Sequence, residues 1–255
     1  MSNSDIAYMG AVIGFDLDDT LYKEVDFLRS GYRAVARLVT ESQLADAGHS
    51  VDPEDLIGEM VQVWRDGGNA FDMLADRFYP ADRYSGEDRE AFIRKAIETY
   101  RFHAPEIQLL PGVREMLEAL KARGVRLVLI TDGRSRSQRN KIRALDLDQF
   151  FAPEDILISE ETGAEKRAIK PWQSVVRRYP NAAKFVYVGD NPAKDFTMPR
   201  RLGWVTLGVR DDGRNIHPQD ISEGCGPDRW LDSIQELTDI LLHISELKPF
   251  SKEKI

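Results

Sequence analysis

Five short apolar runs, rich in β-branched residues, constrain the fold of this chain more than any other feature. They lie at Ala11–Phe15, Val125–Ile130, Ile156–Ile158, Phe185–Val188 and Val205–Val209. Uninterrupted apolar runs of this length are typical of strands that are buried on both faces, as in parallel sheets. Helical patterns separate most of the runs, so the sequence predicts an α/β fold with right-handed crossovers.

Two helical patterns are the clearest. One precedes the second strand and is followed by Gly124, a typical helix stop. The other predicts an amphipathic helix near the C-terminus. Their apolar positions are Val113, Met116, Leu117 and Leu120 in the first helix, and Leu231, Ile234, Leu237 and Leu241 in the second.

A long segment after the first strand contains no convincing strand run. Apolar residues repeat there at helical spacing, and Pro53, Gly67-Gly68 and Pro80 punctuate the pattern. We interpret residues 23–104 as an insert of about four helices, and residues 1–22 and 105–255 as the core that carries the sheet. An insert at the tip of a strand would act as a cap that closes over the end of the sheet.

Charge and composition argue against several classes of function. The formal net charge of −8 disfavours a general nucleic-acid binder, which needs a basic surface. Cys225 is the single cysteine, so the chain holds neither a disulfide framework nor a cysteine-rich zinc site. We see neither a secretory signal pattern nor an apolar run of membrane-spanning length. A cytoplasmic protein without a membrane partner, either a monomer or a homodimer, is therefore the default expectation.

The first motif, Gly14-Phe15-Asp16-Leu17-Asp18-Asp19-Thr20-Leu21, places three acidic residues directly after the first strand. Ligand sites of open α/β sheets lie at the carboxyl ends of the strands. Carboxylates crowded together repel one another unless a cation or a proton compensates. Mg²⁺ bound together with a substrate phosphate is the usual solution. A solvated acidic turn is the alternative.

The second motif is Thr131-Asp132-Gly133, which follows the second strand. A hydroxyl group and free backbone N–H groups at a strand-to-helix turn can cradle an anion. Taken alone, the same three residues are also an ordinary turn sequence.

The third motif is Lys170-Pro171-Trp172. Proline suits the first turn of a helix, so Lys170 would project from a helix start and bridge a carboxylate and a phosphate as a compact charge. A solvated surface lysine is the alternative.

The fourth motif runs from Gly189 to Asp195 and follows the strand at Phe185–Val188. Asp190 sits at the strand end, and we expect Asp195 about one turn into the next helix, facing the same point. Asp190 as a simple helix cap is the alternative. The carboxyl ends of parallel strands share one edge of a sheet, so all four motifs are expected to meet in one cleft.

In this order, the four motifs resemble those of the haloacid dehalogenase-like superfamily of phosphohydrolases, over roughly residues 11–209. The resemblance implies a Rossmann-like core. It also makes residues 23–104 similar to the α-helical cap of the subgroup that includes phosphoglycolate phosphatase and β-phosphoglucomutase.

The resemblance also implies roles for individual residues. Asp16 would be the nucleophile that forms an aspartyl phosphate, and Asp18 the general acid and base. Lys170 would neutralise Asp16 and the phosphoryl oxygens. Thr131, with the backbone of Asp132 and Gly133, would bind the phosphoryl group. Mg²⁺ would be held by Asp16, Asp190 and Asp195 and by the backbone carbonyl of Asp18.

The sequence departs from the family pattern at two places. Lys166 is a second candidate for the third motif, but Lys170 is favoured because the family's lysine usually precedes a proline. Residues 211–217 follow the last of the five runs and could reach the rim of the cleft, or form an ordinary loop.

Phosphoryl transfer is the chemistry that the motifs favour. Asp18 can protonate the leaving oxygen and then deprotonate a water molecule. A halide leaves without a proton, and the resemblance implies that dehalogenases lack this acid. We therefore predict a Mg²⁺-dependent phosphatase of a small phosphorylated metabolite, such as a sugar phosphate. A phosphomutase with the same intermediate and a non-catalytic binding module are the alternatives.

Overall fold

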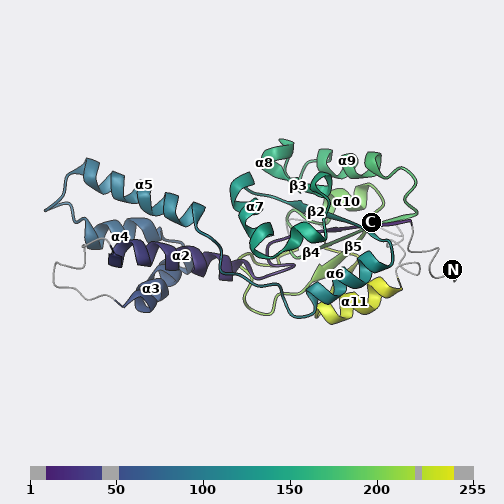
Figure 1. Cartoon of the computed structure of the whole chain (residues 1–255), viewed down its shortest axis with the longest axis horizontal. Coiled ribbons are helices and arrows are strands. Elements are labelled where there is room, and N and C mark those ends of the chain that lie inside the picture. Colours follow the sequence, from purple (N-terminus) through teal and green to yellow (C-terminus); the bar gives the residue numbers. More distant parts are fainter. Residues whose placement is uncertain (1–9, 42–51, 222–225, 244–255) are drawn as a thin grey trace. The chain divides into compact units, whose positions relative to one another are not determined.

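The computed structural model describes residues 10–41, 52–221 and 226–243, and Cys225 lies outside them. Within these ranges six parallel strands form one sheet in the order β3-β2-β1-β4-β5-β6 (Figure 1). This confirms the predicted α/β fold with a Rossmann-like sheet. The strands are β1 (Ala11–Phe15), β2 (Arg126–Thr131), β3 (Ile156–Ile158), β4 (Lys184–Gly189), β5 (Val205–Val209) and β6 (Arg229–Leu231).

The sheet register brings the ends of the central strands to one level. Phe15, the last residue of β1, pairs with Leu129 of β2 and with Val188 of β4. The residues that follow these three strands therefore emerge side by side at the carboxyl edge of the sheet.

β6 is the strand that the sequence did not predict. Its three residues form no apolar run, since Arg229 is exposed and Trp230 is half-buried. The prediction that Leu231 belongs to the C-terminal helix is wrong. Leu231 ends β6, and the helix begins at Ile234.

Helices cover both faces of the sheet. Figure 1 shows α6 and α11 on one side and α9 and α10 on the other. Gly124, with a φ of 75°, follows α6 in the left-handed conformation that a helix stop requires. The core helices are α6 (Val113–Ala122), α7 (Ser135–Ala144), α8 (Ser159–Thr162), α9 (Lys170–Arg178), α10 (Thr197–Arg201) and α11 (Ile234–Leu242), with 3₁₀ turns η2 (Leu147–Gln149) and η3 (Pro153–Asp155).

An aromatic cluster fixes α9 on the sheet. The Trp172 ring is fully buried and meets the rings of Tyr187 and Trp204 edge to face, at centroid distances of 4.7 and 5.6 Å. Its indole Nε1 donates a hydrogen bond of 2.8 Å to the backbone oxygen of Lys166. Burial of this tryptophan therefore also anchors the segment that leads into α9.

The described residues between 25 and 107 form a second compact unit, made of helices, and those before and after this range form the first. Tyr32 packs against Phe71 and Tyr100 in the interior of the helical unit. Its helices are α2 (Glu24–Glu41), α3 (Pro53–Arg65), α4 (Ala70–Phe78) and α5 (Gly86–Phe102). No helix among the described residues is long and apolar enough to cross a membrane.

Candidate active site

Three site residues occupy the tips of neighbouring strands. The backbone N–H of Asp16 donates to the oxygen of Val188 at 2.8 Å, so the residue continues the pairing of β1 with β4. Thr131 is the last residue of β2, and Asp190 directly follows β4. The convergence expected of the first, second and fourth motifs is therefore present.

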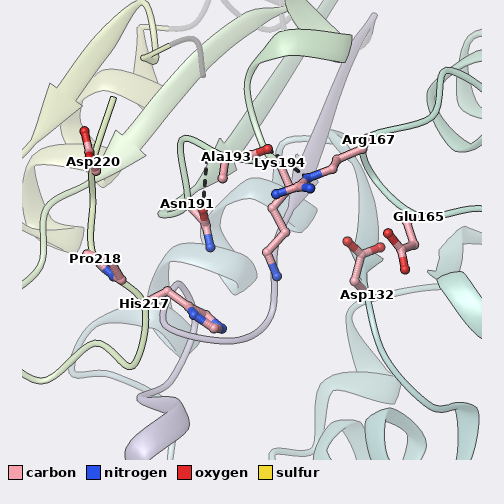
Figure 2. A pocket seen from close by; sticks show the side chains of 9 residues that line it. All are labelled: Asp132, Glu165, Arg167, Asn191, Ala193, Lys194, His217, Pro218 and Asp220. Atoms are coloured by element: carbon pink, nitrogen blue, oxygen red, sulfur yellow. Dashed lines mark hydrogen bonds between the residues drawn. The ribbon is translucent and has the colours of Figure 1, made fainter. Parts of the chain in front are cut away.

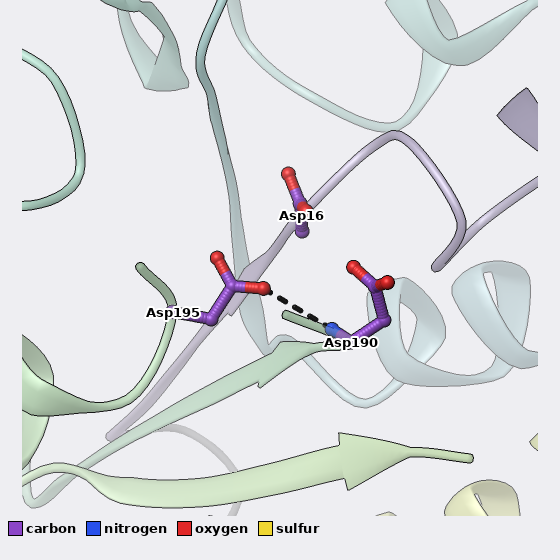
Figure 3. A group of neighbouring side chains, drawn as sticks. All are labelled: Asp16, Asp190 and Asp195. Carbon is purple, nitrogen blue, oxygen red and sulfur yellow. Dashed lines mark hydrogen bonds between the residues drawn. The ribbon is translucent and has the colours of Figure 1, made fainter. Parts of the chain in front are cut away.

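Three buried carboxylates face a common space. One oxygen each of Asp16, Asp190 and Asp195 lies within 4.8 Å of the others (Figure 3). Asp195 lies in the turn before α10, so the prediction that placed it one turn inside a helix is wrong. Its Oδ2 accepts hydrogen bonds from the backbone N–H groups of Asp190 (3.1 Å) and Asn191 (2.8 Å). The backbone of the fourth motif thus fixes the Asp195 carboxylate in the cluster.

Lys166, and not Lys170, supplies the positive charge in this cluster. The Lys166 ammonium lies 2.8 Å from Asp16 Oδ1 and 2.6 Å from Asp195 Oδ1, and the residue is only 2% exposed. Lys170 is exposed and donates to the backbone oxygen of Thr162. The prediction that placed Lys170 beside Asp16 is therefore wrong.

A helical pattern in the sequence contains the signal that separates the two lysines. The buried face of α9 is formed by Pro171, Trp172 and Val175. The residues three, four and seven positions after Lys170, which share its face, are polar. They are Gln173, Ser174 and Arg177. Lys170 thus starts the solvent face of an amphipathic helix, and a lysine upstream of the helix is free to enter the site.

Burial and mutual repulsion raise the pKa values of Asp16 and Asp190, and the single charge of Lys166 does not offset this effect. Burial raises the pKa of Asp16 to about 7, although Lys166 opposes the shift. Burial, together with the charges of Asp195 and Asp16, raises the pKa of Asp190 well above its usual value. Burial disfavours a charged Lys166, but Asp16 and Asp195 outweigh it and raise the pKa of this lysine. Clustered carboxylate oxygens with too little compensating charge fit a hard divalent cation such as Mg²⁺.

Asp18 lies beside the cluster in a separate network of hydrogen bonds. Its Oδ1 lies 2.7 Å from the Lys141 ammonium, and its Oδ2 accepts from the Gln138 amide at 2.9 Å. The Tyr22 hydroxyl also donates to Oδ1. Burial alone would raise the pKa of Asp18, but Lys141, Tyr22 and Gln138 together lower it. Asp18 is thus held in its ionised form.

Sequence reasoning did not single out Gln138 and Lys141 as partners of Asp18. Both project from α7, three positions apart, so they share one face of the helix. Both are also buried in a helix that is otherwise strongly polar. Their burial is seen only in the structure, so the sequence held no signal that separates them from the other polar residues of this helix.

The second motif is only partly available to a phosphate. Thr131 Oγ1 faces the site and accepts a hydrogen bond from Gln138 at 2.6 Å. Asp132 Oδ1 accepts from the backbone N–H of Lys166 at 2.9 Å, so this side chain holds the lysine segment in place. The backbone N–H of Gly133 donates to Ser159 Oγ at 2.9 Å. The amide of Gly133, which we had expected to bind phosphate, is therefore already occupied.

The segment after β5 contacts the site directly. The Asn215 amide donates to Asp190 Oδ2 at 3.0 Å and accepts from the buried Lys23 ammonium at 2.6 Å. The backbone N–H of Ile216 donates to Asp19 Oδ2 at 2.9 Å. Of the two readings of residues 211–217, the reach to the cleft is the one that the structure supports.

Comparisons with known proteins show which family this chain resembles. A model of the haloacid dehalogenase-like hydrolase family matches residues 11–203. Glyceraldehyde 3-phosphate phosphatase of Methanocaldococcus jannaschii is 30% identical over 91% of this chain and 97% of the relative. Ribulose-1,5-bisphosphate 5-phosphatase of Halopiger xanaduensis is 26% identical over 91% of this chain and all of the relative.

A solved structure supports the fold. A putative β-phosphoglucomutase from Thermotoga maritima superposes with a TM-score of 0.62 at 20% identity, covering 92% of this chain and 100% of that one. At this identity the likeness concerns the fold alone. The family match spans most of the chain. The chain therefore belongs to the haloacid dehalogenase-like hydrolase family and is an enzyme of that family.

Proposed function

We propose that this enzyme is a Mg²⁺-dependent phosphatase that cleaves the phosphate monoester of a small metabolite through an aspartyl phosphate on Asp16. The observation that carries the proposal is the Lys166 ammonium between Asp16 and Asp195, next to Asp190. The relatives named above, a glyceraldehyde 3-phosphate phosphatase and a ribulose-1,5-bisphosphate 5-phosphatase, support a sugar phosphate as substrate.

In the first half-reaction, a carboxylate oxygen of Asp16 attacks phosphorus while the bond from phosphorus to the leaving oxygen breaks. Lys166 and the Thr131 hydroxyl bind phosphoryl oxygens and stabilise the charge that shifts onto them. Asp18 gives a proton to the leaving oxygen, and the alcohol departs. The carboxylates of Asp16, Asp190 and Asp195, with the Asp18 carbonyl, would hold Mg²⁺, and the ion would supply positive charge that reduces repulsion between the nucleophile and the phosphate.

In the second half-reaction, a water oxygen attacks the phosphorus of the aspartyl phosphate. Asp18 takes the proton from this water, and the bond between phosphorus and Asp16 breaks. Inorganic phosphate leaves, and the Asp16 carboxylate is restored. One residue can serve both steps because they follow one another.

The two half-reactions require opposite protonation states of Asp18. Its lowered pKa keeps the carboxylate ionised at rest, which is the form that the second step uses. An incoming phosphate dianion places negative charge beside Asp18, and a nearby negative charge raises the pKa of a carboxyl group. Substrate binding thus favours the protonated form that the first step uses.

A phosphate-release screen over phosphorylated metabolites, with and without Mg²⁺, tests the proposal. We expect release that requires Mg²⁺ and that is lost in Asp16→Asn, whereas Asp148→Asn, a change of an exposed carboxylate in η2, retains it. The intact mass of the protein during turnover should show one added phosphoryl group in wild type and none in Asp16→Asn. Isomerised product without phosphate release would instead support a phosphomutase.

A further inference from the structure

A larger cavity adjoins the pocket that holds the carboxylates. The carboxylate pocket has a volume of about 70 Å³, and the adjoining cavity about 590 Å³. The larger volume lies in the range of small-molecule sites. The two linings share four residues, namely Asp132, Asn191, Lys194 and His217. An ester whose phosphoryl group occupies the smaller pocket therefore has room for its leaving group in the larger one.

Two cations, Lys194 and Arg167, line the larger cavity, and no described carboxylate lies within ion-pair distance of either. Lys194 is half-buried, and its ammonium points into the space between His217 and Asp132 (Figure 2). Arg167 donates from Nε to the backbone oxygen of Ala193 at 3.1 Å. Neither side chain forms an ion pair with any residue in ranges 10–41, 52–221 and 226–243. Their remaining N–H groups are thus available to an anionic group of a ligand.

Acceptor groups lie on the other side of the same cavity. Figure 2 shows the carboxylates of Asp132 and Glu165 together, across from His217. Carboxylates accept hydrogen bonds from hydroxyl groups and repel a further anion. Burial and the Lys194 charge lower the pKa of His217, so its neutral ring can both donate and accept.

We propose, on the basis of the phosphatase function above, that this cavity is the leaving-group site and that it selects esters whose leaving group carries a second anionic group and hydroxyl groups. Lys194 and Arg167 bind the second anion, a carboxylate or a phosphate. Glu165 accepts hydrogen bonds from the hydroxyl groups. The preference for such esters thus comes from Glu165, Arg167 and Lys194, which belong to the unit that carries the sheet.

Matched pairs of substrates test this site. In each pair only one ester carries a second anion: 3-phosphoglycerate against glycerol 3-phosphate for a carboxylate, and fructose 1,6-bisphosphate against fructose 6-phosphate for a phosphate. We expect the wild-type kcat/KM to favour the doubly anionic member of at least one pair by about tenfold or more, as charge-assisted hydrogen bonds would give. The pair that shows the preference identifies the second anion.

Substitutions then assign the preference to the two cations. Lys194→Met and Arg167→Met should each reduce the preference severalfold, mainly through a higher KM for the doubly anionic ester. Arg201→Met is the matched control, because Arg201 is an exposed arginine of α10 that does not line the cavity. This control should keep the wild-type preference.

Two outcomes would overturn the inference in distinguishable ways. In the first outcome, the enzyme releases phosphate from 4-nitrophenyl phosphate and other esters, but it shows no preference in either pair, or both variants retain the preference. This result would contradict the leaving-group site and leave the phosphatase function intact. No release from any ester in the presence of Mg²⁺ would contradict the proposed function itself.

Discussion

The Lys141 ammonium lies 2.7 Å from Asp18 Oδ1, so a lysine of α7 holds a carboxylate that follows β1. Lys141 is itself buried, and its other acidic neighbour, Glu24, is 3.8 Å away. Burial raises the pKa of Glu24 to about 8, so Asp18 is the principal charged partner of the lysine. We infer that Lys141 positions the acid and base of the proposed reaction.

Lys141→Met should lower kcat by about 10- to 100-fold with a smaller effect on KM, because it keeps the aliphatic stem and removes the anchor of Asp18. Lys141→Arg should restore part of the rate, since it keeps a positive charge within reach. Steady-state kinetics measure both effects. Arg143→Met, on an exposed arginine of the same helix, is the control. A rate for Lys141→Arg no better than for Lys141→Met would contradict a positioning role.

Lys166→Met should reduce activity by roughly 10²- to 10³-fold, because a buried donor to the phosphoryl group and to Asp16 is lost. Lys170→Met should stay close to the wild-type rate, because the Lys170 side chain is exposed and donates a hydrogen bond to the Thr162 backbone, away from Asp16. Phosphate release from one substrate by both variants provides the measurement. The opposite order of effects would restore Lys170 as the residue of the third motif.

Mg²⁺ binding should release protons below about pH 7. In the metal-free protein the pKa of Asp16 is about 7, raised from 3.8 by burial, so at pH 6 this carboxyl group is largely protonated. Metal binding requires the charged form. Titration calorimetry at pH 6, in two buffers with different ionisation enthalpies, should give different apparent binding enthalpies. Identical enthalpies in both buffers would show that no proton leaves.

The same pKa shift predicts how pH affects the stability of the metal-free protein. Between pH 4 and 7 the folded state binds more protons at Asp16 than the unfolded state does. The free energy of unfolding should therefore fall as the pH rises through this window. Asp16→Asn should flatten this part of the profile, measured by urea denaturation at several pH values. If the free energy of unfolding falls with pH as steeply in Asp16→Asn as in the wild type, groups other than Asp16 cause the pH dependence.

Asn215→Ala should weaken Mg²⁺ binding by about tenfold, because Asn215 holds Asp190 Oδ2 through its amide. Calorimetric titration with Mg²⁺ gives the dissociation constant without relying on turnover. Asn181→Ala, on an exposed asparagine before β4, should bind Mg²⁺ as the wild type does. An unchanged dissociation constant in Asn215→Ala would mean that the backbone alone positions Asp190.

The strands could be predicted because they are buried on both faces and therefore read as apolar runs. The observed β1, β3 and β5 coincide with the predicted ranges, and β2 and β4 differ only at their ends. Arg229–Leu231 could not be found in this way, because an edge strand of three residues with one buried side chain leaves no apolar run.

The positions of Asp16, Thr131 and Asp190 could also be predicted, since residues that follow parallel strands emerge at one edge. The contacts of Asn215 with Asp190 and of Lys141 with Asp18 could not, because Asn215 lies in a loop and Lys141 on a helix, and the order of the strands does not fix where these side chains point. The prediction of Lys170 is wrong because a local Lys-Pro pattern does not show which face of α9 is buried. Lys170 lies on the opposite, exposed face.

The place of β1 in the sheet has a consequence for biosynthesis. Among the six strands of the sheet β1 is synthesised first, yet its two neighbours, β2 and β4, follow only after the helical unit of residues 25–107 has been made. Until then both edges of an apolar strand lack their partners, and such edges are prone to wrong pairing. Nascent chains that stall after the helical unit has been made but before β2 emerges should therefore depend most on chaperones.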